Sequence, residues 1–417
     1  MNRNYDSLKR SYNDPRSDAE KNKLEVIRHC KASELGELDD SEMIIFYLFL
    51  LFLTSGDDAI DMDDGLSYEE MTELAYRARW MEKEAHMEGD EIFRFLCSIR
   101  DREFSTIKES LKRGFEDNVN PFFIREGKKL TPKEISETVA SCWSSRRVTR
   151  FNEWQVAMAE NLFSITDGDR ILIETEYMPG PFMSIGSEFD RDLIIAVSDS
   201  DQRVLTKMAF FMCVPESGRS RCTITCGYES DEERSGLSFN KNLVLFPDFA
   251  FSVCNEAVFQ EVTDKGVAKL FVVNDGFLRM RNRDVLENRR HIIELGNDVS
   301  VLSFGIRNPS APSMILLSPK TSDSSVSMLS VRFCDEILND ESCSQIATAL
   351  KGSGENRFSP SVVKVSREEA CAHDYMLIPD YYRESGSSEI RNVYEIDKEL
   401  DREYEKMRRL TSFFLRG

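Results

Sequence analysis

Few residues in this chain have types and spacings that could support chemistry. The four histidines lie far apart in the sequence, and none has a partner at metal-ligand spacing. No Gly-x-Ser-x-Gly turn offers an activated serine, and no Gly-x-x-x-x-Gly-Lys loop offers a phosphate cradle. Cys222 and Cys226 are four residues apart but lack the second pair that a zinc site needs. We therefore expect no metal and none of these common catalytic sites.

The charge balance restricts the partners of the chain. Lysine and arginine number 54 against 74 acidic residues, giving a net charge of −20, and such a surface repels polyphosphate at long range. Two basic clusters, 146–150 and 279–290, interrupt this background. They either contact phosphates or form an ordinary solvated surface, and Asp284 and Glu287 dilute the second cluster. DNA remains possible as a partner if a local basic face or another subunit attracts it.

Cysteine usage and hydropathy indicate a cytoplasmic protein. The ten cysteines are scattered, several of them inside apolar runs, which is typical of reduced core residues. The N-terminus is polar and does not resemble a signal peptide. The apolar run Met43–Leu53 is only about half the roughly 20 residues needed to span a bilayer, so we expect a buried helix and no membrane contact.

Three regions differ in their hydrophobic pattern. Residues 1–125 show helical spacing, including 68–87 and 91–115, and predict a helical N-terminal domain. Residues 126–385 alternate strands with helices, the latter at about 132–143, 152–163, 202–213, 252–263 and 282–295, which predicts a mostly parallel sheet covered on both faces. Residues 386–417 form a long amphipathic helix with an apolar seam from Ile390 to Phe414, suited to pairing with another helix.

Seven strands are expected in the middle region. The last two are joined by the short link Gly305–Pro312, which permits an antiparallel hairpin at a sheet edge. The expected strands are Arg170–Glu174, Asp192–Val197, Thr223–Cys226, Asn242–Phe246, Ala268–Asn274, Val299–Phe304 and Ser313–Ser318.

The order of several motifs resembles a known family. A Thr-Pro-led helix at Lys129–Ile135 precedes the first strand, Val273–Gly276 resembles Leu-Pro-Asp-Gly, and Asp374–Tyr382 resembles a Tyr-x-Leu-x-Pro segment before the tail. In this collinear order the chain resembles the modification subunits of type I restriction–modification systems, which are gamma-class N6-adenine DNA methyltransferases. The resemblance covers most of the chain and implies a Rossmann-like class I methyltransferase sheet of seven strands.

The loop after the first strand departs from the family pattern. The resemblance implies Asp-Pro-x-Cys-Gly-Ser-Gly-Gly-Phe here, whose glycines let the backbone approach S-adenosylmethionine. The sequence instead reads Glu-Thr-Glu-Tyr-Met-Pro-Gly-Pro-Phe over Glu174–Phe182, in which Gly180 and Phe182 match. The loop is either a remodelled cofactor site or a decayed one, and we favour decay. By resemblance the vestigial cofactor-binding residues are Thr131, Glu174, Gly180 and Asp199.

The catalytic tetrapeptide also departs from the family. The resemblance implies Asn or Asp, then Pro-Pro, then an aromatic residue, which grip and stack a flipped adenine. By strand register Pro247 occupies the acceptor position, and proline has no side-chain acceptor. A shift of one residue would make Asp248 the acceptor and Phe249 the stacking ring. The alternative, which we favour, is an apolar strand end followed by a capping aspartate.

These features lead to one hypothesis and two alternatives. The chain is interpreted as a catalytically degenerate DNA adenine methyltransferase-like subunit, acting in binding or assembly within a DNA modification or phage-defence system. Its tail would bind a specificity-type or methyltransferase subunit, and no cofactor is expected. The first alternative is an active S-adenosylmethionine-dependent, adenine-specific DNA methyltransferase with a divergent site. The second is a protein-only regulatory scaffold.

Overall fold

The fold is known here from a computed structural model that describes part of the chain. The described residues are 45–46, 49–50, 52–53, 67–87, 89–101, 153–175, 179–197, 200–214, 219, 221–226, 236–245, 262, 265–273, 275–279, 283–294, 298–304, 312–319, 326–331 and 339–382.

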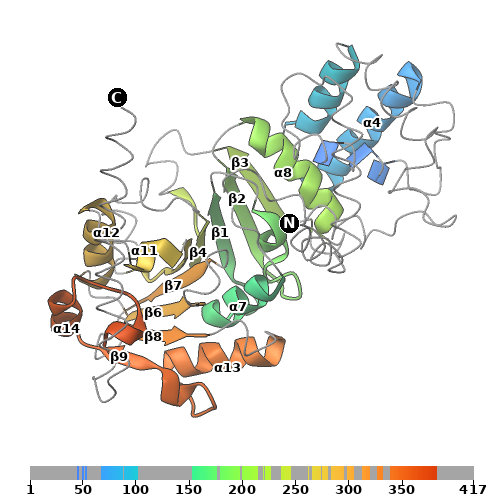
Figure 1. Ribbon diagram of the computed structural model, residues 1–417. Helices are drawn as coiled ribbons and strands as arrows, with labels where there is room; N and C mark the ends of the chain where they lie inside the picture. Colours follow the sequence, from blue (N-terminus) through green and yellow to red (C-terminus); the bar gives the residue numbers. More distant parts are fainter. Residues whose placement is uncertain are drawn as a thin grey trace, which may run out of the picture.

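A nine-stranded sheet forms the centre of the molecule, in the order β3-β2-β1-β4-β5-β7-β6-β8-β9 (Figure 1). The strands β1 to β5 are parallel, and β7 runs antiparallel to both of its neighbours, β5 and β6. The strands are β1 (Arg170–Thr175), β2 (Asp192–Val197), β3 (Cys222–Cys226), β4 (Lys241–Leu245), β5 (Ala268–Val273), β6 (Asp298–Ser303), β7 (Ser313–Ser318), β8 (Val326–Ser330) and β9 (Val363–Val365).

All seven strands expected from the sequence are present, and two more extend the sheet. The antiparallel pairing of β6 with β7 confirms the predicted hairpin. Beyond β6, β8 pairs in parallel and β9 pairs antiparallel to β8. The strand β8 was not predicted because it reads Val-Ser-Met-Leu-Ser, without the long apolar run that marks the central strands.

Helices cover both faces of the sheet, as parallel strands require. Ile171 and Ile173 share a core with α7, α8 and α13, whereas Val244 and Phe271 share a second core with α11, α12 and α14. Successive residues of a strand point to opposite faces, so neighbouring positions supply the two cores. The helices are α4 (Tyr68–Glu84), α7 (Glu153–Phe163), α8 (Ser200–Cys213), α11 (Asp275–Arg279), α12 (Arg283–Glu294), α13 (Asp340–Lys351) and α14 (Arg367–Ala372), with 3-10 turns η1 (Gly180–Ser184), η3 (Ser359–Ser361) and η4 (Pro379–Tyr381).

An N-terminal helical unit packs beside α8 (Figure 1). It comprises α4, the helix 91–101 and the described helical residues between 45 and 53. Ser67 and Glu70 form a reciprocal capping box at the start of α4, which satisfies two backbone N–H groups. The apolar run predicted to be a buried helix supplies Phe46, which is fully buried and stacks edge-on against Phe95. Among the described helices, none is long and apolar enough to cross a membrane.

Several predictions concern residues outside the described ones. The helix expected at 132–143 and the tail helix from Ile390 to Phe414 lie there, and so does the helix expected at 252–263 apart from Val262, which is helical and buried. The boundaries placed at 125 and 385 also fall in these segments, so the three-domain division stays a prediction. The helices expected at 152–163, 202–213 and 282–295 are confirmed as α7, α8 and α12.

Candidate functional site

The strand order creates a topological switch point between β1 and β4. From β1 the chain moves outward to β2 and β3, and it then returns to the other side of β1 as β4. Ligands of open α/β sheets bind outside the carboxyl ends of the strands at such a point, where the connections leave in opposite directions. Thr175, Val197 and Leu245 are aligned in register at these carboxyl ends. This edge is therefore the candidate binding site.

The connection from β1 to β2 begins at that edge. Its described part starts at Pro179 and continues into η1, a single turn of 3-10 helix. Pro179 and Pro181 carry no N–H group, and the N–H of Phe182 donates to the Pro179 carbonyl at 3.3 Å. Gly180 is buried at φ +59, the left-handed conformation that favours glycine. Gly180 therefore allows the backbone conformation of the turn, and the residue itself is not exposed.

This geometry can be tested against the cofactor that the resemblance implies. A loop that holds the anionic end of S-adenosylmethionine needs accessible backbone N–H groups and glycines that leave space for the ligand. Across 179–182 two N–H groups are missing and a third is used within the turn. The turn 179–182 therefore leaves only the N–H of buried Gly180 as a donor, and this turn does not fit the anionic end of the cofactor.

Glu174, the penultimate residue of β1, points along the sheet face to Asn242 of β4. The Asn242 Nδ2 donates to the Glu174 Oε2 at 2.9 Å and to the Leu172 carbonyl at 3.3 Å. Asn242 is fully buried, and its Oδ1 has no hydrogen-bond partner in the described part of the chain. Lys269 of β5, aligned with Asn242, is also fully buried. Glu174 thus contributes to a polar group inside the sheet, which sequence reasoning missed.

The other candidate residues cannot be placed. Thr131, Asp199, Asp248 and Phe249 all lie outside the described residues, as does Pro247. Asp199 comes two positions after the end of β2, and Pro247 comes two positions after the end of β4. The topology therefore starts both segments from neighbouring strand ends, but gives no contact between their side chains.

In the described part of the second basic cluster, one arginine is buried and another is paired with an acidic residue. Arg289 is fully buried and donates from Nη1 to the Phe277 carbonyl at 3.1 Å, so it packs in the core. Arg290 is exposed and forms an i,i+4 ion pair with Glu294 at 2.9 Å. Arg289 and Arg290 therefore do not support the interpretation of this cluster as a phosphate-binding surface.

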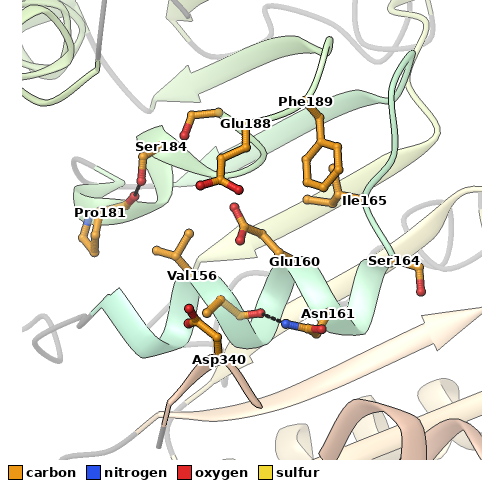
Figure 2. A pocket seen from close by; sticks show the side chains of 12 residues that line it. Val156, Glu160, Asn161, Ser164, Ile165, Pro181, Ser184, Glu188, Phe189 and Asp340 are labelled. Atoms are coloured by element: carbon orange, nitrogen blue, oxygen red, sulfur yellow. Dashed lines mark hydrogen bonds between the residues drawn. The ribbon is translucent and has the colours of Figure 1, made fainter. Parts of the chain in front are cut away.

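A separate cavity of about 580 Å³ lies between α7, η1 and the start of α13. Figure 2 shows the carboxylates of Glu160 and Glu188 directed toward one another across it, with Asp340 below. Burial raises the pKa of Glu160, and the repulsion of Glu188 adds to this, while a 2.7 Å hydrogen bond from the Gly186 N–H opposes it. The lining includes Pro181 and Ser184 of η1 but no strand residue, so the cavity lies on the helix side of the β1–β2 connection. In the described ranges no group of three His, Cys, Asp or Glu is placed to hold a metal.

Comparison with known proteins identifies the fold. Neither a protein-family model nor a curated protein sequence matches the chain. A type I restriction-modification system methyltransferase subunit from Streptococcus thermophilus is 12% identical, with a TM-score of 0.54 over 87% of this chain and 98% of that one. The type IIG restriction endonuclease BpuSI is 9% identical, with a TM-score of 0.50 over 88% of this chain and 47% of that one.

These similarities agree with the strand order found in the chain. The sheet has the Rossmann-like arrangement of class I methyltransferases, with an antiparallel β7 between β5 and β6. The fold class expected from the sequence is therefore confirmed.

Proposed function

We propose that this chain is a methyltransferase-like subunit that has lost methyl transfer and acts by binding, within a DNA modification or phage-defence assembly. The observation that carries the proposal is the β1–β2 connection, which begins at the switch point and whose described turn, 179–182, is not an open glycine loop. Pro179 and Pro181 remove two backbone donors, and Gly180 is buried. A fold that keeps its scaffold can still present surfaces to partners after its reaction centre is gone.

Two further features support the loss of chemistry. The Glu174 carboxylate, which by resemblance stands in for the cofactor-loop aspartate, receives a hydrogen bond from the buried Asn242. In the sequence, Pro247 occupies the position that grips the target amino group in the family, and its ring nitrogen carries no acceptor. The first feature affects the implied cofactor loop and the second affects the implied base-binding position. An active enzyme would therefore need a replacement for both.

Calorimetric titration of the full chain with S-adenosylmethionine tests this proposal. We expect no saturable heat up to millimolar cofactor, because Pro179 and Pro181 carry no N–H, that of Phe182 is used within the turn, and Gly180 is buried. Circular dichroism on the same sample verifies that the chain is folded. Saturable binding in the micromolar range, together with transfer of a methyl group to adenine in DNA, would overturn the proposal.

The same titration decides the first alternative, an active adenine-specific DNA methyltransferase. It is favoured by the left-handed φ of Gly180 and by the complete strand order around the switch point. In that case Asp248 and Phe249 would be the first residues to substitute. Asp248→Ala would then abolish methylation while leaving cofactor binding unchanged.

The tail is proposed as the partner-binding element. A seam with Leu400 and Met407 suits pairing with a helix of a specificity-type or methyltransferase subunit. Leu400→Asp combined with Met407→Asp should abolish partner co-purification, because two charges enter an apolar seam. Arg402→Ala combined with Arg409→Ala is the matched control, since it changes the net charge equally at positions off the seam. Equal retention of the partner by both double variants would remove the tail from the proposal.

The second alternative is a protein-only regulator, and the net charge of −20 favours it over direct DNA binding. Co-purification distinguishes it from a DNA-bound assembly. A partner methylase retained at high salt without DNA supports the regulator, because phosphate contacts weaken steeply with salt.

A further inference from the structure

Four charged side chains join the N-terminal helical unit to α8. Lys207 Nζ lies 2.9 Å from Glu91 Oε2 and 3.5 Å from Glu82 Oε1. Arg203, one turn earlier on α8, pairs with the other oxygen of Glu91. Glu82 belongs to α4 and Glu91 begins the helix 91–101, so three helices meet at this cluster. We call these four residues the α8 latch.

Glu82 also caps the helix 91–101. Its Oε1 accepts from the backbone N–H of Glu91 at 3.1 Å and of Ile92 at 3.3 Å, and its Oε2 lies 3.5 Å from the N–H of Phe93. These are N–H groups that a helix start leaves without an internal partner. One carboxylate therefore fixes the turn between the two helices and pairs with Lys207 at the same time.

The turn that Glu82 holds is conformationally unfavourable. His86 and Asp90 have φ of +55 and +47, a left-handed conformation that side chains with a Cβ rarely adopt. Asp90 is held by Arg79 at 2.7 Å. Strained residues of this kind persist only where surrounding contacts determine their geometry. The turn therefore depends on contacts that include the latch.

The inner pair of the latch, Glu82 and Lys207, is sealed from water, whereas Glu91 and Arg203 are 16% and 29% exposed. Glu82 is fully buried and Lys207 is 2% exposed. Separating the two inside the protein would leave two buried charges without their partners, whereas separating them in water requires the helical unit to leave α8. Partial opening is therefore costly, so any separation of the unit from α8 should be all-or-none.

We propose that the α8 latch is a two-state docking device that releases the N-terminal helical unit from the sheet without unfolding the sheet. Arg203 and Lys207 lie in the first two turns of α8, which starts at Ser200 directly beyond the carboxyl end of β2. The α8 residues of the latch thus lie next to the candidate binding edge. The latch is independent of the proposed function, because it concerns packing within the chain alone.

Hydrogen exchange of the full chain tests the latch. In Lys207→Met, which keeps the length of the side chain, the amides of 91–93 should exchange at least ~100-fold faster, which corresponds to about 2.8 kcal/mol at 1.4 kcal/mol per tenfold. The amides of β1 and β4 should change by less than about threefold. Arg203→Gln is the milder variant, because Lys207 stays in place, and it should accelerate the same amides by roughly tenfold.

The control is Arg290→Gln, which breaks an exposed ion pair far from α8 and should leave 91–93 unchanged. Two results overturn the latch. In the first, the exchange of 91–93 is unaffected in both latch variants. In the second, the amides of β1 and β4 accelerate as much as those of 91–93, which means that the unit and the sheet open only together. If Lys207→Met does not fold, Arg203→Gln alone decides between these outcomes.

Discussion

Replacing Glu82 by glutamine tests whether its buried negative charge stabilises or destabilises the folded protein. Glutamine keeps an oxygen that can accept from the N–H groups of Glu91 and Ile92, so the helix start stays capped. It removes the negative charge next to Lys207, which still has Glu91 at 2.9 Å. The substitution therefore isolates the charge of one carboxylate from its hydrogen bonds.

The expected magnitude follows from two opposing contributions. At 3.5 Å and an effective dielectric constant of about 20, the attraction of Lys207 is about 5 kcal/mol. Taking a carboxylate out of water costs several kcal/mol, which is of similar size. Burial raises the pKa of Glu82 above its ordinary 4.5 despite Lys207 and three backbone N–H groups, so the cost of burial is the larger. We expect Glu82→Gln to lower the free energy of unfolding at pH 7 by no more than about 1 kcal/mol.

The direction with pH follows from the raised pKa. The folded protein binds this proton more tightly than the unfolded chain, so Glu82 contributes stability that is fully present below about pH 4.5. That contribution is lost as the pH rises through the folded pKa. The wild type should therefore gain stability relative to Glu82→Gln as the pH falls from 7 towards 4.5.

Urea unfolding of both proteins at a series of pH values measures this difference. Glu73→Gln is the control, because Glu73 pairs with Arg77 on an exposed face and its loss should cost less than about 0.5 kcal/mol at any pH. The reasoning is refuted if Glu82→Gln is about 3 kcal/mol less stable at pH 7 and the deficit shrinks on acidification. That result would mean that the charge is favourable in the folded state.

Three further predictions use urea unfolding or alkylation. Phe182→Ala in η1 should lower the free energy of unfolding by about 3–5 kcal/mol, because the ring is fully buried. A decrease of less than about 1 kcal/mol would show that the turn repacks freely. Gly186→Ala should lower the free energy of unfolding more than Gly168→Ala. Both positions have a positive φ, but only at 186 would the new Cβ lie 3.1 Å from the Arg191 Cδ. Equal decreases for the two variants would contradict this. Burial raises the pKa of Cys222 to about 12, so iodoacetamide at pH 8 should label exposed Cys371 and leave Cys222 unmodified by mass spectrometry, whereas equal labelling would show that β3 opens.

The sheet could be predicted from the sequence because its central strands are buried on both faces. Runs such as Asp192–Val197 and Ala268–Val273 are almost continuously apolar and are bounded by polar residues, which fixes their ends. The strand β9 and the helix α13 were missed for the opposite reason. The strand β9 has only three residues, and α13 contains small polar residues that weaken its helical pattern.

The candidate site could be predicted only in outline. Strand order places the ends of β1, β2 and β4 together, and this follows from the alternation of strands and helices. The pairing of Glu174 with Asn242 could not be predicted, because a single asparagine inside Lys-Asn-Leu-Val-Leu does not reveal its partner on another strand. The latch was missed for the same reason, since Glu82 and Lys207 are far apart in sequence and each resembles a surface charge on an amphipathic helix.

The last two strands have a consequence for solubility. The edge strand β9 is short and carries Lys364 on an exposed position, so this end of the sheet is a poor template for intermolecular pairing. The strand β8 behind it is buried over its first four residues, among them Val326, Met328 and Leu329. A chain cut after residue 331 would expose that strand, and it should aggregate even though the seven strands around the switch point remain complete.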